Sequence, residues 1–411
     1  MNTGRIIFSQ LMDIVPKYEF QKIVNYHKGD YRVRQFKCWD QFLCMCFGQL
    51  TFRNSLRDLT STLNALGTRR YHMGIKQSVP LSTLSDANAS RPWEIYQELA
   101  MVLIAHAQKL YGKDEVTESI RILDSSTIDL CLSLFQWAEF REHKAAIKLH
   151  TMMDLQGAIP TFIHISDGKM HDVNILDMIP ILAGSIYIMD RGYLDFERLH
   201  HLHSQGGRFV IRARKNLQYY RKSSSSVDFS DGLQCDQIIR LTGNKTKHRY
   251  PESLRRVRLI DKENNQDIVL LTNITKCDAQ QIADYYKSRW QIELFFKWIK
   301  QNLRIKAFYG QSINAVKTQI WTAICTYLIM IICHKTNHFN VTLHTMMQVL
   351  SVAILERMTL KQLFSEQSLT QLETLDRIYN LPRLCESVPL RITSPSESES
   401  SSPASENSNV H

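Results

Sequence analysis

The sequence shows neither the cysteine patterns of secreted or zinc-stabilised proteins nor the apolar core of a secretory leader. Its 411 residues include nine cysteines, an odd number, and no two of them form a Cys-x-x-Cys pair. This excludes a disulfide framework and a structural zinc site, and it fits a reducing cytoplasm. Residues 1–20 contain no apolar core of seven residues, so we expect no secretory signal peptide.

Long apolar runs are also absent. The longest run, Ile320 to Cys333, has 14 residues and includes two threonines. A helix that crosses a bilayer needs about 20 apolar residues. The run therefore predicts a buried core helix and a protein without a membrane partner.

Positive charge is present in excess and is concentrated in two blocks. The formal net charge is +10 and the pI is about 9.1. Residues 1–76 contain 12 Lys or Arg against 5 Asp or Glu, and residues 208–258 contain 13 against 4. Two basic blocks predict two nucleic-acid surfaces, because Lys and Arg neutralise phosphates. The candidate contacts in them are Arg32, Arg34, Arg212, Arg214 and Lys215.

Hydrophobic periodicity divides the chain into four parts. Residues 1–112 show helical spacing and predict a helical DNA-binding domain, with a plain dimerisation domain as the alternative. Residues 113–335 predict an α/β domain with a basic, β-rich insertion at about 217–273. Residues 336–392 predict further helices, and the Ser- and Pro-rich residues 393–411 predict a disordered tail.

Several segments carry local expectations. Strands are expected at residues 120–124, 146–155, 158–168 and 185–190, and a helix at 173–182. The polar stretch 221–228 predicts a mobile loop, and helices are expected at 314–334 and 343–358. Ser55 is expected to cap one helix and Asp195 another, and Asp129 is expected to serve a similar local role.

Two aspartates follow apolar, strand-like runs. Asp124 ends the run Ile-Arg-Ile-Leu, and Asp190 ends Ile-Tyr-Ile-Met before a glycine turn. We expect both carboxylates to lie at the ends or edges of neighbouring strands. Carboxylates converging in this way provide the hard oxygen ligands that Mg²⁺ prefers.

A third acid lies on a polar stripe of a predicted apolar helix. At about 100° per residue, one face collects Tyr286, Arg289, Glu293, Lys297 and Lys300. We expect the rest of this helix to be largely buried. An acid among cations suits a metal ion held beside a phosphodiester, and a solvated face with i,i+4 salt bridges is the alternative.

These motifs, Asp-Ser-Ser, Asp-Arg-Gly-Tyr and Tyr-x2-Arg-x3-Glu-x6-Lys, resemble the DDE transposases of the insertion-sequence 4 type. The resemblance covers roughly residues 115–335 and implies a ribonuclease-H-like core. It implies that Asp124, Asp190 and Glu293 bind two Mg²⁺ ions, for which Mn²⁺ substitutes, and that Tyr286, Arg289 and Lys300 contact DNA phosphates. It further implies a homodimer that joins two inverted-repeat ends and inserts them into target DNA.

One feature departs from this family. Related transposases carry a tryptophan in the insertion that accepts a flipped base, but residues 191–289 contain none. The other aromatic candidates there are Tyr219, Tyr220, Phe229 and Tyr250. His171 and Asp172, after Gly168, are further residues expected near the site if a strand-to-helix turn brings them there.

The sequence therefore predicts a metal-dependent, cut-and-paste transposase of bacterial cytoplasm, associated with the nucleoid when bound to DNA. Two alternatives stay open: an element-derived DNA-binding repressor without catalysis, and a nuclease of the same fold. Three converging acids favour an enzyme, because a binding module gains nothing from carboxylates placed near phosphates.

Overall fold

The computed structural model describes residues 4–111, 119–141, 144–214, 216–229, 232–261, 266–303, 305 and 308–365. All of these residues except Ser365 belong to one compact unit, which ends at Phe364. The predicted tail at 393–411, the second half of the predicted helical region 336–392, and Lys215 lie outside the described residues.

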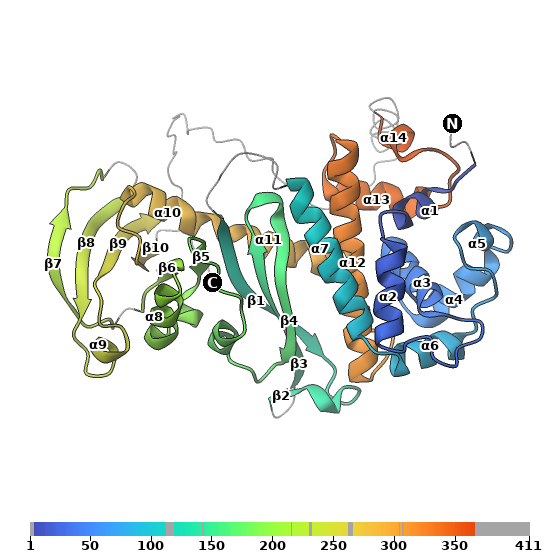
Figure 1. The fold of residues 1–411 in the computed structure, drawn as a ribbon, viewed down its shortest axis with the longest axis horizontal. Coiled ribbons are helices and arrows are strands. Elements are labelled where there is room, and N and C mark those ends of the chain that lie inside the picture. Colours follow the sequence, from blue (N-terminus) through green and yellow to red (C-terminus); the bar gives the residue numbers. More distant parts are fainter. Residues whose placement is uncertain are drawn as a thin grey trace, which may run out of the picture. The chain divides into compact units, whose positions relative to one another are not determined.

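Helices form the first part of the chain, as predicted (Figure 1). They are α1 (Ile7–Met12), α2 (Lys17–Tyr26), α3 (Cys38–Leu50), α4 (Leu56–Ala65), α5 (Arg69–His72), α6 (Leu81–Ser90) and α7 (Glu94–Tyr111). Ser55 caps α4 by accepting a hydrogen bond from the backbone N–H of Asp58, which confirms its predicted role. The helices bury their apolar faces against α12 (Ile313–Asn337), so one core joins the two ends of the unit.

Ten strands among the described residues form one mixed sheet. They are β1 (Ile120–Leu130), β2 (Glu139–Arg141), β3 (Lys144–Asp154), β4 (Ile159–Asp167), β5 (Ile186–Met189), β6 (Arg208–Arg212), β7 (Tyr219–Ser225), β8 (Leu233–Leu241), β9 (Leu254–Asp261) and β10 (Gln266–Thr272). The order is β2-β3-β1-β5-β6-β10-β9-β8-β7, and β4 pairs with β3. β1 runs antiparallel to β3 and parallel to β5, which runs parallel to β6. The expected α/β core is therefore confirmed.

The sheet separates two apolar cores because successive side chains of a strand point to opposite faces. Ile122 belongs to the core shared with α11 (Trp290–Asn302) and α12. Leu123 belongs to a second core on the other face, which contains residues of α8 (Phe196–Ser204) and of the 3-10 helix η3 (Asp172–Asp177). The alternation directs Asp124 toward α11 and Ser125 toward η3.

The predicted insertion extends the core sheet. β10 pairs antiparallel with β6, and β9, β8 and β7 follow outward. The prediction of a mobile loop at 221–228 is wrong, since residues 221–225 form most of the edge strand β7. A serine-rich composition does not prevent strand formation here, because β8 offers a free edge whose backbone groups pair with any residue type.

Three further expectations need correction. The helix expected at 173–182 is only the 3-10 helix η3, and Pro180, which has no backbone N–H to donate, lies in the irregular segment after it. Asp129 lies inside β1 opposite Ala146 and caps nothing. The helix expected to reach residue 358 is α13 (Leu343–Ala353), followed by the short α14 (Leu360–Leu363). Asp195, in contrast, caps α8 as predicted.

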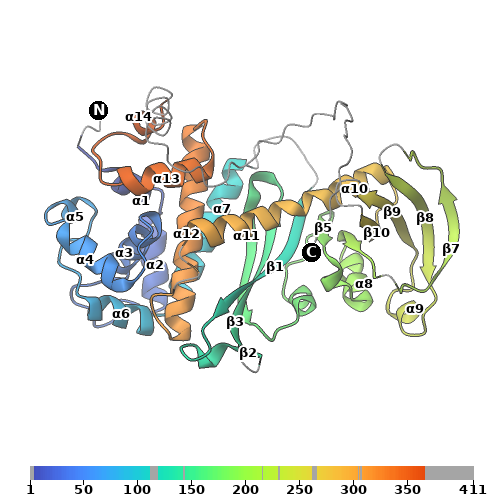
Figure 2. The same cartoon turned by 180° about the vertical axis from the view of Figure 1, so that it is seen from behind.

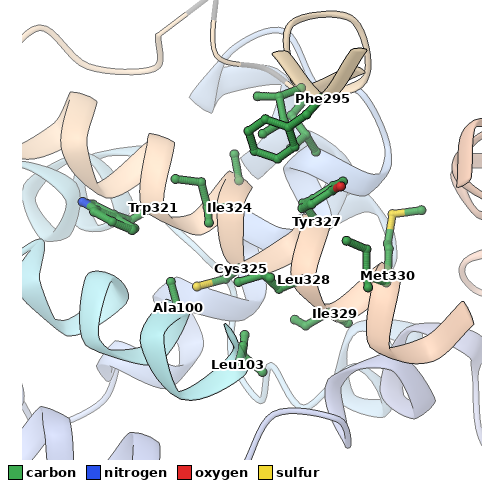
Figure 3. Packing of buried hydrophobic residues seen from close by; sticks show 14 of the residues in the cluster. Ala100, Leu103, Phe295, Trp321, Ile324, Cys325, Tyr327, Leu328, Ile329 and Met330 are labelled. Atoms are coloured by element: carbon green, nitrogen blue, oxygen red, sulfur yellow. The ribbon is translucent and has the colours of Figure 1, made fainter. Parts of the chain in front are cut away.

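Helix α12 lies at the centre of the larger core. Figure 3 shows Trp321, Ile324, Cys325 and Leu328 among side chains from neighbouring helices. The ring of Tyr327 meets that of Phe295 on α11 edge to face, at a centroid distance of 5.2 Å. Among the described residues α12 is long and apolar enough to cross a membrane, but 94% of its apolar window is buried inside the protein. It is therefore the predicted core helix, and it fixes α11 against the sheet.

Candidate active site

The first two predicted acids lie side by side on the sheet. β1 and β5 pair in parallel from Ile120 opposite Ile186 to Leu123 opposite Met189. Asp124 and Asp190 are the residues that follow this paired stretch, one after Leu123 and the other after Met189. β1 is longer than expected and continues beside β3 to Leu130, so Asp124 lies within the strand, at the point where pairing with β5 ends.

The third acid comes from a helical pair that crosses the same sheet (Figure 2). The predicted single helix is two helices, α10 (Ala279–Ser288) and α11, which meet at Arg289. Arg289 has φ −53° and ψ −30°, so the helical stripe continues from Tyr286 to Glu293. Leu294 is 47% exposed, so the expectation that its side of the helix is buried is wrong.

Direct contacts join the stripe to the two aspartates. The Arg289 guanidinium lies 3.0 Å from the Asp124 carboxylate and 2.5 Å from that of Glu293. The Tyr286 hydroxyl donates to Asp190 Oδ1 at 3.1 Å. Residues from β1, β5, α10 and α11 are thus brought together. The stripe is therefore not the solvated face that the sequence left open as an alternative.

The two lysines of the stripe are placed differently. Lys300 Nζ donates to the backbone carbonyl of Thr127 at 2.9 Å, which ties α11 to β1. Lys297 is exposed.

The site perturbs its own ionisation. Burial, together with the nearby carboxylates of Glu293 and Asp190, raises the pKa of Asp124 to about 6, although the Ser125 N–H and Arg289 oppose the shift. Burial and the adjacent Asp190 raise the pKa of Tyr286 to about 12, so its phenol stays protonated and donates.

The three carboxylates fit a divalent metal by their chemistry, although their present geometry does not form a ligand set. No group of three His, Cys, Asp or Glu in the described part of the chain is spaced to hold an ion. The Arg289 guanidinium lies between Asp124 and Glu293 instead. One cation thus already neutralises two of the acids, and an ion would take over that charge once the guanidinium moves.

A second polar cluster lies on the opposite face of β1. Ser125 Oγ donates to Asp172 Oδ1 at 2.8 Å, and Lys148 Nζ lies 3.2 Å from the same oxygen. His150 is fully buried beside them, and Tyr193 is 2% exposed. Sequence reasoning had placed Asp172 near the site conditionally, and it missed the other four. The available signal was a lysine and a histidine at alternate positions, 148 and 150, with apolar residues on either side of Lys148.

The basic residues predicted to bind DNA lie on several elements. Arg212 ends β6 and is close enough to Tyr286 to influence its ionisation, and Arg214 is exposed just beyond it. Arg32 is exposed with its guanidinium over the Tyr31 ring. Arg34 lines a cavity of about 710 Å³ among the N-terminal helices. The other residues that line this cavity include Lys17, Lys37, Lys76, Phe36 and Trp39.

The aromatic candidates of the insertion divide by exposure. Tyr250 is fully buried, and its hydroxyl lies 2.8 Å from His203 Nδ1. Tyr219 lies beneath the Arg256 guanidinium. Tyr220 and Phe229 are 47% and 66% exposed, so of the four only these two present an open ring for stacking.

Comparison with known proteins identifies the family of this chain. Residues 115–329, more than half of the chain, match the transposase DDE domain, and residues 3–76 match a domain of unknown function (DUF4372). A protein of Sinorhizobium fredii named as transposase y4zB is 33% identical over 273 residues, which cover 64% of this chain and 76% of that one. The chain is 25% identical over 319 residues to a protein of Synechocystis named as a transposase for insertion sequence element IS4SA, covering 74% and 84%.

A relative from Geobacillus stearothermophilus, named as a transposase for insertion sequence element IS5377, is 28% identical over 252 residues, 61% of this chain and 66% of its own. Among solved structures, the piggyBac transposase synaptic complex with hairpin DNA gives a TM-score of 0.42 at 11% identity, over 95% of this chain and 86% of that one. With its α/β core and matched domain, the chain belongs to the DDE transposases of insertion sequences.

Proposed function

We propose that this transposase cuts DNA at the ends of its own insertion sequence and joins them to target DNA, with Asp124, Asp190 and Glu293 as its catalytic carboxylates. The observation that supports this assignment is the bridge from Arg289 to Asp124 and Glu293. Three acids from two strands and a helix otherwise repel one another, and such an arrangement adds little to stability unless a cation binds there.

The proposed cofactor is a pair of Mg²⁺ ions, or Mn²⁺ in their place, held by these three side chains. When bound, the ions supply an activated water or 3′-hydroxyl and neutralise charge on the attacked phosphodiester. Asp124 and Asp190 present their oxygens from the rigid sheet, and Glu293 presents its own from α11. The contact between the buried rings of Phe295 and Tyr327 holds α11 in place against α12.

Arg289 and Tyr286 have a second task in this proposal. Without metal, Arg289 neutralises Asp124 and Glu293. Once these acids are engaged, its N–H donors are free for phosphate oxygens, which they bind in the same planar geometry as carboxylates. The protonated Tyr286 phenol orients Asp190, and Lys297, Lys300, Arg212, Arg214 and Lys215 are assigned to the DNA backbone.

The N-terminal helices are the proposed end-recognition domain. Four cations, Lys17, Arg34, Lys37 and Lys76, surround the 710 Å³ cavity, whereas Asp40 is its only acidic lining residue in the described part of the chain. Asp40 is also engaged, since it accepts from the Lys37 backbone N–H. Such a cavity attracts the phosphates of the inverted repeats. The proposal also includes a homodimer that holds two transposon ends and acts on chromosomal DNA.

The decisive experiment uses Asp124→Ala, Asp190→Ala and Glu293→Ala with a labelled transposon end. Each variant should lose strand cleavage in Mg²⁺, by at least about 100-fold, because transition-state charge is no longer stabilised. Binding of the same DNA in Ca²⁺ should change little. Near-normal cleavage by any variant would remove that residue from the site, and cleavage by the wild type in excess chelator would refute the metal mechanism.

A further inference from the structure

We infer that Asp172 is a positioning residue that acts on Asp124 through Ser125. This inference rests on the proposed role of Asp124 as a metal ligand. It concerns the face of the sheet opposite α11, where neither the family match nor the triad motifs assign a role to the polar residues.

Ser125 connects the two aspartates by separate groups. Its hydroxyl donates to Asp172 Oδ1 at 2.8 Å, and its backbone N–H donates to Asp124 Oδ1, also at 2.8 Å. The side chain is held on one face of the sheet while the amide holds the carboxylate on the other. The contact of the Ser125 hydroxyl therefore restrains the backbone whose N–H orients Asp124.

Asp172 is itself held firmly. Lys148 Nζ lies 3.2 Å from its carboxylate and also donates to the carbonyl of Met170 at 2.8 Å. His150 Nδ1 lies 3.8 Å from the same carboxylate, while its Nε2 is engaged with Ser166 Oγ. Burial lowers the pKa of His150 to about 4, so the ring is neutral at neutral pH and Lys148 is the cation that balances Asp172.

A purely structural role explains this cluster poorly. The Lys148 side chain is only 14% exposed, on a face whose neighbouring residues Leu123 and Met152 belong to an apolar core. Desolvating an ion pair there gains little stability, and apolar side chains would attach η3 to the sheet at least as well. Tyr193 Oη is also buried on this face, and burial together with Asp124 and Asp172 raises its pKa well above the usual value. Polar groups are thus concentrated behind Asp124.

Residues that orient a metal ligand have a characteristic signature. Their replacement typically reduces metal affinity by about 10- to 100-fold while the fold persists. Asp172→Ala should therefore raise the Mn²⁺ dissociation constant by about 10-fold, and Ser125→Ala should do the same. Asp172→Asn should largely restore the affinity, because the asparagine oxygen still accepts from the Ser125 hydroxyl.

The test measures Mn²⁺ binding to the full-length protein by calorimetry, without DNA, alongside thermal unfolding in chelator. Asp177→Ala is the matched control, since Asp177 lies on the same η3 and pairs with Arg198 at 2.7 Å, away from Ser125. It should leave Mn²⁺ affinity unchanged. In the double variant Ser125→Ala/Asp172→Ala the loss should equal that of either single change, because both break one path.

Unchanged Mn²⁺ affinity in folded Asp172→Ala, or an equal loss in Asp177→Ala, would overturn the inference. If Asp172→Ala does not fold, Ser125→Ala decides, because it leaves the Lys148 contacts of Asp172 in place. Failure of the proposed function looks different: the wild type itself would then bind no Mn²⁺ at the site, or Asp124→Ala would bind it normally.

Discussion

Replacing Arg289 by alanine tests whether its guanidinium stands in for a metal ion. The side chains of Arg289, Asp124 and Glu293 are 18%, 19% and 35% exposed, so the bridge is largely shielded from water. Removing one partner of a buried ion pair costs 3–5 kcal/mol, and the partial exposure of Glu293 favours the lower end, about 3 kcal/mol. A ligand that binds only the folded state, present at about 100 times its dissociation constant, restores about 2.7 kcal/mol.

Urea unfolding in chelator and in Mn²⁺ measures both quantities. Arg289→Ala should be about 3 kcal/mol less stable than the wild type in chelator, and nearly equal to it in saturating Mn²⁺. Its Mn²⁺ affinity without DNA should rise, because the ion no longer competes with the guanidinium. Arg198→Ala is the control, since it removes a more exposed pair with Asp177 and should cost at most about 1 kcal/mol with or without metal.

The reasoning would be refuted if Arg289→Ala were as stable as the wild type in chelator, or if Mn²⁺ stabilised the wild type more. The DNA role is tested separately in Ca²⁺. There the variant should bind a transposon end more weakly, with the slope of log affinity against log salt reduced by about one for the lost phosphate contact.

Three further outcomes are expected. The pKa of Asp124 is raised to about 6, and its ionised form is the one proposed to bind metal. Mn²⁺ affinity should therefore be constant above about pH 6 and fall about tenfold per pH unit below it. Calorimetry that finds the same affinity on both sides of pH 6 would contradict this. Arg34→Ala/Lys37→Ala should lower the salt slope of end binding by about two, whereas Lys22→Ala, outside the cavity lining, should leave it unchanged; equal slopes in gel-shift titrations would exclude the cavity. Asp236→Ala should cost about 3 kcal/mol in urea unfolding, because Arg255, 6% exposed, loses its carboxylate partner, and a loss below 1 kcal/mol would show that water reaches the pair.

The placement of Asp190 after a strand and of Glu293 on a helix was predictable because the sequence signals are local. An apolar run followed by Asp190, and helical spacing from Tyr286 to Glu293, depend only on residues near in sequence. These patterns also placed the core helix α12 correctly. The contact between Arg289 and Asp124 joins residues 165 positions apart, and spacing alone gave no indication of it.

The polar cluster behind Asp124 was harder to predict from the sequence, because it too depends on contacts between distant residues. Lys148 and His150 approach Asp172 only because β3 pairs with β1 in a register that sets Ser125 opposite His150. A shift of one residue would send these side chains to the other face. The edge strand β7 was mistaken for a loop because its formation depends on the free edge of β8, which no local composition reports.

The pairing of β10 with β6 has a consequence for where the DNA is cut. The basic insertion is hydrogen-bonded into the same sheet as Asp124, and α10, which carries Tyr286, packs on β6 and β9 alike. A hinge between insertion and core would have to break this ladder, so the two parts move as one rigid body. Any phosphate bound by the insertion would then lie at a fixed distance from the proposed catalytic carboxylates. The length of the sheet would thus set the distance between the bound phosphate and the cut. Lengthening β6 or β10 by two residues should displace the cleavage position along the DNA strand.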